Sequence, residues 1–187
     1  MHLLRSLGAA AALLLATVTA AQAQGYPFSQ RGIVAQRVAF TDVGIEYGRP
    51  TARGRTLFGA LVPWDSIWHP GADSATQLTV SRDVTIEGRD VPAGTYTIWL
   101  IPRQAGPWTL ILNRTRAIQH TPYPGASSDL LRLDVVPEQF SHLETLTYFF
   151  PAVLRDEAQL RIQWGTTAIS VRLKAAFRPN DNRQPSR

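Results

Sequence analysis

Apolar and polar residues alternate with a period of two along much of this chain, and this pattern most constrains its fold. In residues 95–100, for example, Tyr96, Ile98 and Leu100 alternate with two threonines and a tryptophan. Successive side chains of a β-strand point to opposite faces, so the alternation indicates strands that bury one face. No segment shows a helical stripe of useful length.

The same pattern predicts strands over residues 43–47, 77–81, 84–87, 95–100, 108–113, 130–136, 144–150, 160–164 and 168–174. Glycine and proline mark the expected reversals at 87–94, 102–107 and 164–167. Eight or nine short strands with tight connections indicate an all-β fold, because each sheet must bury its apolar face against another. We therefore expect an antiparallel β-sandwich, with a jelly-roll-like strand order as one arrangement.

The two ends of the chain have the features of processing and tail segments. Residues 1–23 combine a positive start, an apolar run and the small-residue pattern Ala21-Gln22-Ala23, which predicts a signal peptide and a mature chain from Gln24. We expect a periplasmic or secreted protein with a loose lead-in over 24–32, one domain over 33–177 and a disordered polar tail over 178–187.

Composition excludes several classes of function. The chain has no cysteine, which excludes disulfides, thiol nucleophiles and thiolate metal ligands. Its formal charge of +5 becomes +4 when Arg5 leaves with the signal, and the arginines are spread along the chain. Nucleic-acid binding would require clustered basic residues, so no nucleic-acid partner is expected. No later window is long and apolar enough to predict a membrane span.

The stretch "WDSIWHPGADSAT", residues 64–76, concentrates the residues that could carry chemistry. His69 and Asp73 could bind zinc, or act as a base and its orienting group beside Ser66, Ser74 or Thr76. A catalytic zinc as a rule needs three protein ligands, and no second histidine lies at ligand spacing. We therefore predict no metal and no cofactor, with Asp73 accepting backbone N–H bonds in a Pro-Gly turn and His69 capping it.

Five tryptophans offer aromatic surface for a ligand. Alternation places Trp108 and Trp164 on the apolar side of their strands, so these two are predicted to be core. Trp64 and Trp68 lie on the loop, and Trp99 falls on the polar face of its strand. These three are the candidates for a binding platform.

Three arginines in "GRPTARGR" precede that loop. Arg49, Arg53 and Arg55 could converge on an anion, because guanidinium groups match carboxylate and phosphate geometry. For Arg49 and Arg55 we favour structural pairing with a carboxylate such as Glu46 or Glu144, and we expect Arg53 to be solvated.

The string Glu46 to Pro102, with "YGRP", "GR", "LVP" and "PAGTY", resembles the secreted bacterial family called domain of unknown function 2911. The later strings "WTLILN", "DLLRLDV" and "LRIQW" are similar to its remaining strands. Where the family has Trp-Arg-x-Gly-Ala-Asn-Glu, this chain has Trp68 to Ser74, "WHPGADS". If a family site uses that arginine and glutamate, this member has lost the activity or changed its ligand.

The predicted function is a non-catalytic module that binds a small polar or glycan-like ligand, or an envelope protein, at the loops between Arg49 and Thr76. The tentative ligand-binding residues are Arg49, Arg55, Trp64, Trp68, His69, Asp73 and Trp99. The alternative is a periplasmic hydrolase or metal-assisted enzyme that uses the 64–76 loop, so catalysis is left open.

Overall fold

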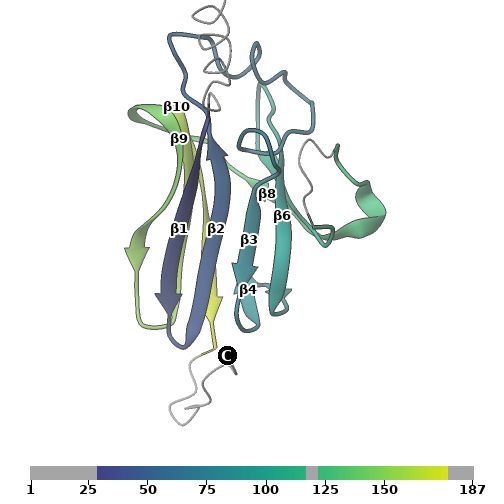
Figure 1. The fold of residues 1–187 in the computed structure, drawn as a ribbon, viewed down its shortest axis with the longest axis vertical. Helices are drawn as coiled ribbons and strands as arrows, with labels where there is room; N and C mark the ends of the chain where they lie inside the picture. The colour runs from purple at the N-terminus through teal and green to yellow at the C-terminus, as the bar shows by residue number, and fades with distance from the viewer. Residues whose placement is uncertain (1–28, 117–121, 177–187) are drawn as a thin grey trace, which may run out of the picture.

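The structure is a computed structural model that describes residues 29–116 and 122–176. The predicted signal peptide and polar tail lie outside the described residues. The described chain forms ten strands in two antiparallel sheets, which confirms the predicted all-β sandwich. Figure 1 shows the long hairpin of β9 and β10 beside β1 and β2, and contacts between these strands join the two layers.

The first sheet has six strands in the order β1-β2-β3-β6-β7-β8. Their bounds are β1 (Gln30–Val38), β2 (Thr41–Arg49), β3 (Gln77–Val80), β6 (Gly94–Ile101), β7 (Trp108–Asn113) and β8 (Asp129–Val135), and a 3-10 turn over Ala126–Ser128 precedes β8. Most neighbours in this sheet are also consecutive in sequence, which differs from the jelly-roll-like order left open by the sequence.

The second sheet has four strands in the order β5-β4-β10-β9. Their bounds are β4 (Val84–Ile86), β5 (Arg89–Val91), β9 (Glu138–Val153) and β10 (Glu157–Ala175). Glu87 and Gly88, with φ of 48° and 75°, join β4 to β5 as a two-residue hairpin loop. The segment 87–94, which was expected to be a single reversal, therefore contains the short strand β5.

The strand predictions were wrong in two further places. β1 begins at Gln30, inside the expected lead-in, and pairs with the whole of β2. Residues 164–167 are not a reversal, because β10 runs through them as one strand. Gly165 has a φ of 59° and the register between β9 and β10 shifts on both sides of it, so this glycine serves a β-bulge.

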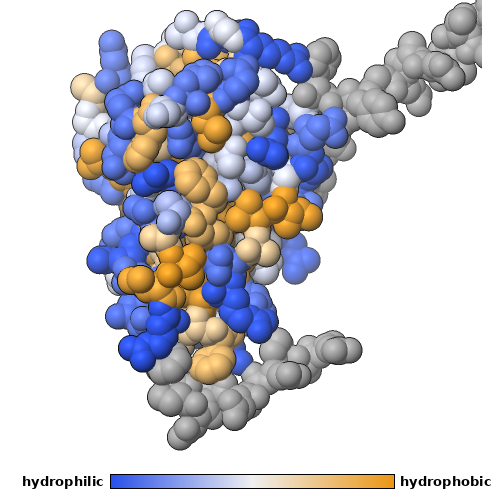
Figure 2. Space-filling view, turned by 90° about the vertical axis from the view of Figure 1, so that its left-hand side faces the viewer, coloured by the Kyte–Doolittle hydropathy of each residue, from blue (hydrophilic) through white to orange (hydrophobic). Residues whose placement is uncertain are grey.

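The core lies between the sheets and contains the inward-facing side chains of both. Tyr96, Ile98 and Leu100 are all buried there, which confirms the predicted register of β6. Trp108 and Trp164 are each 3% exposed, so the prediction that they are core is also confirmed. Figure 2, which faces the side of β9, shows hydrophobic side chains in separate groups among hydrophilic ones. None of the helices in the described residues is long and apolar enough to cross a membrane.

Candidate functional site

The chain between β2 and β3, residues 50–76, closes one end of the sandwich, at the top of Figure 1. Ala52 N donates to Glu144 O at 2.8 Å and Leu146 N donates to Pro50 O at 2.9 Å, which ties this chain to β9. Trp68 exchanges two backbone hydrogen bonds with Leu100 of β6, at 2.8 and 2.7 Å. The loop is therefore bonded to both sheets.

The Pro-Gly corner of this loop is a packed junction. The buried Pro70 carbonyl accepts hydrogen bonds from the Tyr148 hydroxyl at 2.8 Å and from Thr76 Oγ1 at 2.9 Å. A Cβ on Gly48 would lie 2.9 Å from the Ala72 carbonyl carbon and closer still to its oxygen. Glycine at position 48 therefore lets the corner lie directly against β2.

Tyr148, in β9 of the second sheet, connects that sheet to the corner. Its ring meets that of Tyr47 edge to face, with centroids 4.5 Å apart, and its backbone N–H donates to the Tyr47 hydroxyl at 3.1 Å. Burial raises the pKa of the Tyr148 phenol well above its ordinary value, so the hydroxyl keeps its proton and remains a donor. Sequence alternation placed Tyr148 in a strand but gave no sign of this contact.

His69 and Asp73 differ in their surroundings at this corner. The His69 ring is half-buried and meets Trp99 edge to face, with centroids 5.7 Å apart. Asp73 is exposed with a φ of 63°, and its carboxylate accepts no hydrogen bond from the described residues, so the predicted turn bonds are wrong. Among residues 29–116 and 122–176, no group of three or more His, Cys, Asp or Glu side chains could hold a metal ion.

Trp64 and Trp68 are half-buried and pack into an aromatic cluster at the end of the core. The Trp68 ring stacks on Trp164, with centroids 5.9 Å apart and an interplanar angle of 21°. The Trp64 ring stacks on Phe58 at 6.2 Å, and Phe58 in turn contacts Trp108 at 4.7 Å. The two loop tryptophans therefore form part of a wall, not a flat exposed platform.

Trp99 does not join this cluster. Its side chain is on the opposite face of β6, is 3% exposed and donates from Nε1 to Thr97 Oγ1 at 2.9 Å. Ala75, Ile111 and partly buried residues of the loops cover it. The prediction that Trp99 lies on an open polar face is therefore wrong. Its ring is covered and is not accessible to a ligand.

Two adjoining hollows open beside the aromatic cluster, and Arg55 and Trp164 line both. The Arg53 hollow has a volume of about 450 Å³ and is lined by Ser29, Pro50, Thr51, Arg53, Arg55, Leu61, Val62, Trp68, Gly71 and Trp164. The His142 hollow also has about 450 Å³ and is lined by Ala52, Gly54, Arg55, Thr56, Leu57, Phe58, Trp64, His142, Trp164, Gly165, Thr166 and Thr167. Both volumes fall in the range of small-molecule sites.

The arginines do not pair as the sequence suggested. Arg31, not Arg49 or Arg55, binds Glu46, at 2.6 Å. The Arg49 side chain lies across Gly32 and donates to Thr147 Oγ1 at 3.3 Å, while its buried Nε has no partner in the described residues. Arg55 donates from Nε to Ala52 O at 2.9 Å and from Nη2 to Thr51 O at 2.6 Å. Structural ion pairing of Arg49 and Arg55 was therefore the wrong prediction.

Glu144, which the sequence offered as an ion-pair partner of Arg49 or Arg55, lies beside Arg53 together with His142, a residue that the sequence did not single out. The Glu144 carboxylate is 2.9 Å from His142 Nε2 and accepts the Arg53 backbone N–H at 2.6 Å. The hydrogen bond with His142 and then that with the Arg53 backbone lower the pKa of Glu144. The long-range pairing of the 50–52 segment with β9 brings Glu144 beside Arg53 and accompanies the position of His142 in the lining of the His142 hollow.

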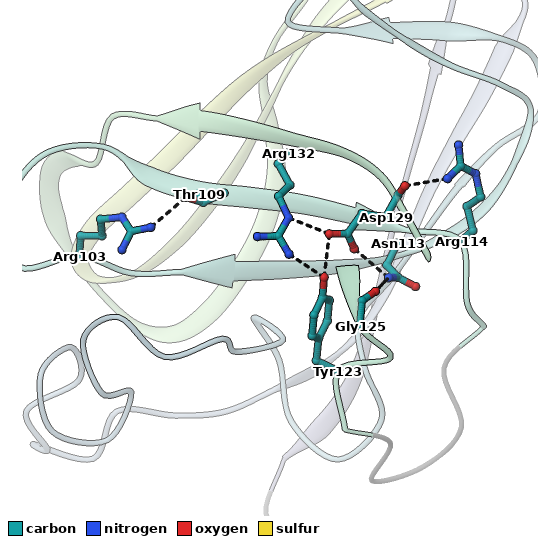
Figure 3. Close-up of polar contacts among 8 residues, drawn as sticks. All are labelled: Arg103, Thr109, Asn113, Arg114, Tyr123, Gly125, Asp129 and Arg132. Carbon is teal, nitrogen blue, oxygen red and sulfur yellow. Dashed lines mark hydrogen bonds and ion pairs between the residues drawn. The ribbon is translucent and has the colours of Figure 1, made fainter. Parts of the chain in front are cut away.

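A second polar cluster lies on the outer side of the first sheet (Figure 3). Asp129 accepts hydrogen bonds from the Tyr123 hydroxyl at 2.7 Å and from Arg132 Nε and Asn113 Nδ2, each at 2.8 Å. Its side chain is only 7% exposed. Both Asp129 carboxylate oxygens therefore have partners within the protein, and the cluster fixes the chain at the start of β8 against β7.

Comparison with known proteins gives a family and nothing more specific. The model of the family described as "Protein of unknown function (DUF2911)" matches residues 29–173. No curated protein and no solved structure matches the chain.

Proposed function

Since the chain belongs to the DUF2911 family of proteins of unknown function, its role must be inferred from its site, and we propose a non-catalytic module that binds a small polar or glycan-like ligand. The observation that carries this proposal is the pair of adjoining hollows that share Arg55 and Trp164. The ligand lies against these two side chains.

The lining has the composition expected of a binding site for such a ligand. Small-molecule sites combine apolar and aromatic walls with a few polar groups that orient the ligand. Here Trp68, Trp164 and Leu61 supply apolar surface, while Arg53 and Arg55 supply hydrogen-bond donors. The backbone bonds that hold the 50–52 segment on β9 keep this lining in place before a ligand arrives.

A hydrolytic or metal-assisted reaction at His69 and Asp73 has less support. His69 lies against Trp99, and Asp73 is exposed on the corner. Neither residue is in the lining of the Arg53 hollow or the His142 hollow. Neither of these two hollows therefore gives His69 and Asp73 a shared space in which to act on a substrate.

Indole N–H resonances in ¹⁵N–¹H NMR spectra test the proposal, because the five tryptophans report on different places. In a screen of neutral hexoses, uronic acids and free amino acids, a ligand should shift the Trp64, Trp68 or Trp164 signals. The Trp99 signal, from the opposite face of the sheet, should stay unchanged. Ligands that shift Trp99 alone, or a complete screen without shifts in the hollows, would contradict the proposal.

A blocking variant tests the location of the ligand. Leu61 lines the Arg53 hollow and is 43% exposed, so Leu61→Trp should fill the hollow without disturbing the core. Val136→Trp is the control, because Val136 is a hydrophobic residue that is 68% exposed elsewhere. Only the first variant should lose binding. Equal affinities of the two variants would place the ligand outside the hollow.

Export is part of the proposal, and it is supported by the sequence pattern of residues 1–23. Mass spectrometry of the protein from its native compartment should give a chain that begins at Gln24. A chain that retains Met1 and the apolar run would exclude export with cleavage at this position.

A further inference from the structure

We propose that the ligand carries an oxyanion, a carboxylate or a phosphate, and that this group binds the Arg55 guanidinium where the two hollows adjoin. The inference rests on the proposed binding function and adds the chemical class of the ligand. Arg55 is the charged side chain that lines both hollows.

The charge of Arg55 is not neutralised by an ion pair. Arg31, Arg37, Arg103 and Arg132 each bind a carboxylate at 2.6 to 2.8 Å. Arg55 has no such partner in the described residues, and the neighbouring Glu144 is occupied by His142 and by the Arg53 backbone N–H. Glu144 feels the positive charge of Arg55 only as the weakest of the influences on its pKa.

The guanidinium is nevertheless held in one place. Its Nε and Nη2 bind the carbonyls of Ala52 and Thr51, and the Ala52 backbone is fixed by its own hydrogen bond to Glu144 O. A guanidinium has five N–H donors, so about three remain for a ligand. An arginine that is already oriented loses little side-chain entropy when it binds, and its planar donors match an oxyanion.

The surroundings favour an anion over a cation or a neutral group. The linings contain the positively charged side chains of Arg53 and Arg55, and neither lining contains an aspartate or glutamate. Trp68 and Trp164 exclude water from part of the space, which strengthens the attraction between the guanidinium and an oxyanion.

Paired probes test the inference: D-glucuronate against D-glucose, which share a ring, and inorganic phosphate for the other oxyanion. Glucuronate, phosphate or both should shift the Arg55 Nε–H resonance, and the responding anion identifies a carboxylate or a phosphate ligand. Arg55→Ala should weaken binding of that anion by about ten- to a hundred-fold, the usual worth of a charge-assisted hydrogen bond.

The control is Arg37→Ala, which removes the same charge from the exposed pair with Asp42. It should change affinity by less than about twofold, because an exposed distant charge is screened by salt. An Arg55 resonance unmoved by both anions overturns the inference, as does glucose binding as tightly as the anion that responds. If glucose bound in the hollows, the proposed binding function would still hold without the oxyanion. A full screen without shifts would contradict both the binding function and the oxyanion inference. The resonance of the unaltered protein decides the matter even if Arg55→Ala fails to fold.

Discussion

The shared acceptor at Pro70 makes a quantitative prediction about the corner. Tyr148→Phe removes one donor to this carbonyl and Thr76→Val removes the other, and both hydroxyl-bearing residues are fully buried. Each single change leaves one hydrogen bond to the carbonyl. Each should therefore lower the free energy of unfolding by about 0.5–1.5 kcal/mol, the net worth of a neutral hydrogen bond.

The double variant should lose more than the sum of the two. With both donors gone, the buried Pro70 carbonyl has no partner among the described residues, and an unsatisfied buried carbonyl costs about 1–3 kcal/mol. Urea unfolding of the four proteins measures this excess as the coupling energy of a double-mutant cycle.

The matched control is a cycle of Tyr96→Phe with Thr76→Val. The Tyr96 hydroxyl binds a different carbonyl, that of Pro92, at 2.8 Å. This cycle should be additive within about 0.5 kcal/mol. Equal additivity in the Tyr148 cycle would refute the argument, because it would mean that the two hydroxyls do not satisfy the same group.

Two other predictions concern the same junction. Gly48→Ala would drive a Cβ into the Ala72 backbone and should lower the free energy of unfolding by about 1–3 kcal/mol, whereas Gly44→Ala, with open space in the same strand, should be neutral or slightly stabilising in urea unfolding. The raised pKa of Tyr148 stabilises the fold below the ordinary value of 10.0, and this contribution is lost as the pH rises above it. The urea midpoint of Tyr148→Phe should therefore fall less steeply than that of the unaltered protein above about pH 10, and parallel curves would contradict the assignment.

The sequence predicted the regular strands well because their burial alternates along the chain. It failed at Gly165, where a β-bulge and a chain reversal both require a left-handed residue and only the partner strand distinguishes them. It also failed at β1, an edge strand where alternation is weak and Ile33 is 76% exposed. β1 is held mainly by backbone hydrogen bonds to β2, and these leave little mark on side-chain pattern.

The loop that carries the site was found from its composition, but its contacts were not. The sequence favoured a carboxylate partner for Arg55, such as Glu46 or Glu144, whereas the fold gives it two carbonyls of its own turn. Alternation correctly placed Trp99 and Thr97 on one face of β6. The burial of that face depends on loops distant in sequence, which alternation does not reveal. The position of His142 in the lining of its hollow accompanies the long-range pairing of Thr51 with Thr145.

The corner and the Arg53 hollow depend on the same contacts. Gly71 lines the hollow and directly follows Pro70, whose carbonyl is bound by Tyr148 from the second sheet. Trp68, two residues earlier, lines the hollow as well and is fixed by paired backbone bonds to Leu100. These contacts set the shape of the hollow before a ligand binds, which lowers the entropic cost of binding. The stretch from Trp64 to Thr76 is therefore a structural corner that builds one wall of the proposed site, at which we propose that the Arg55 guanidinium selects the ligand.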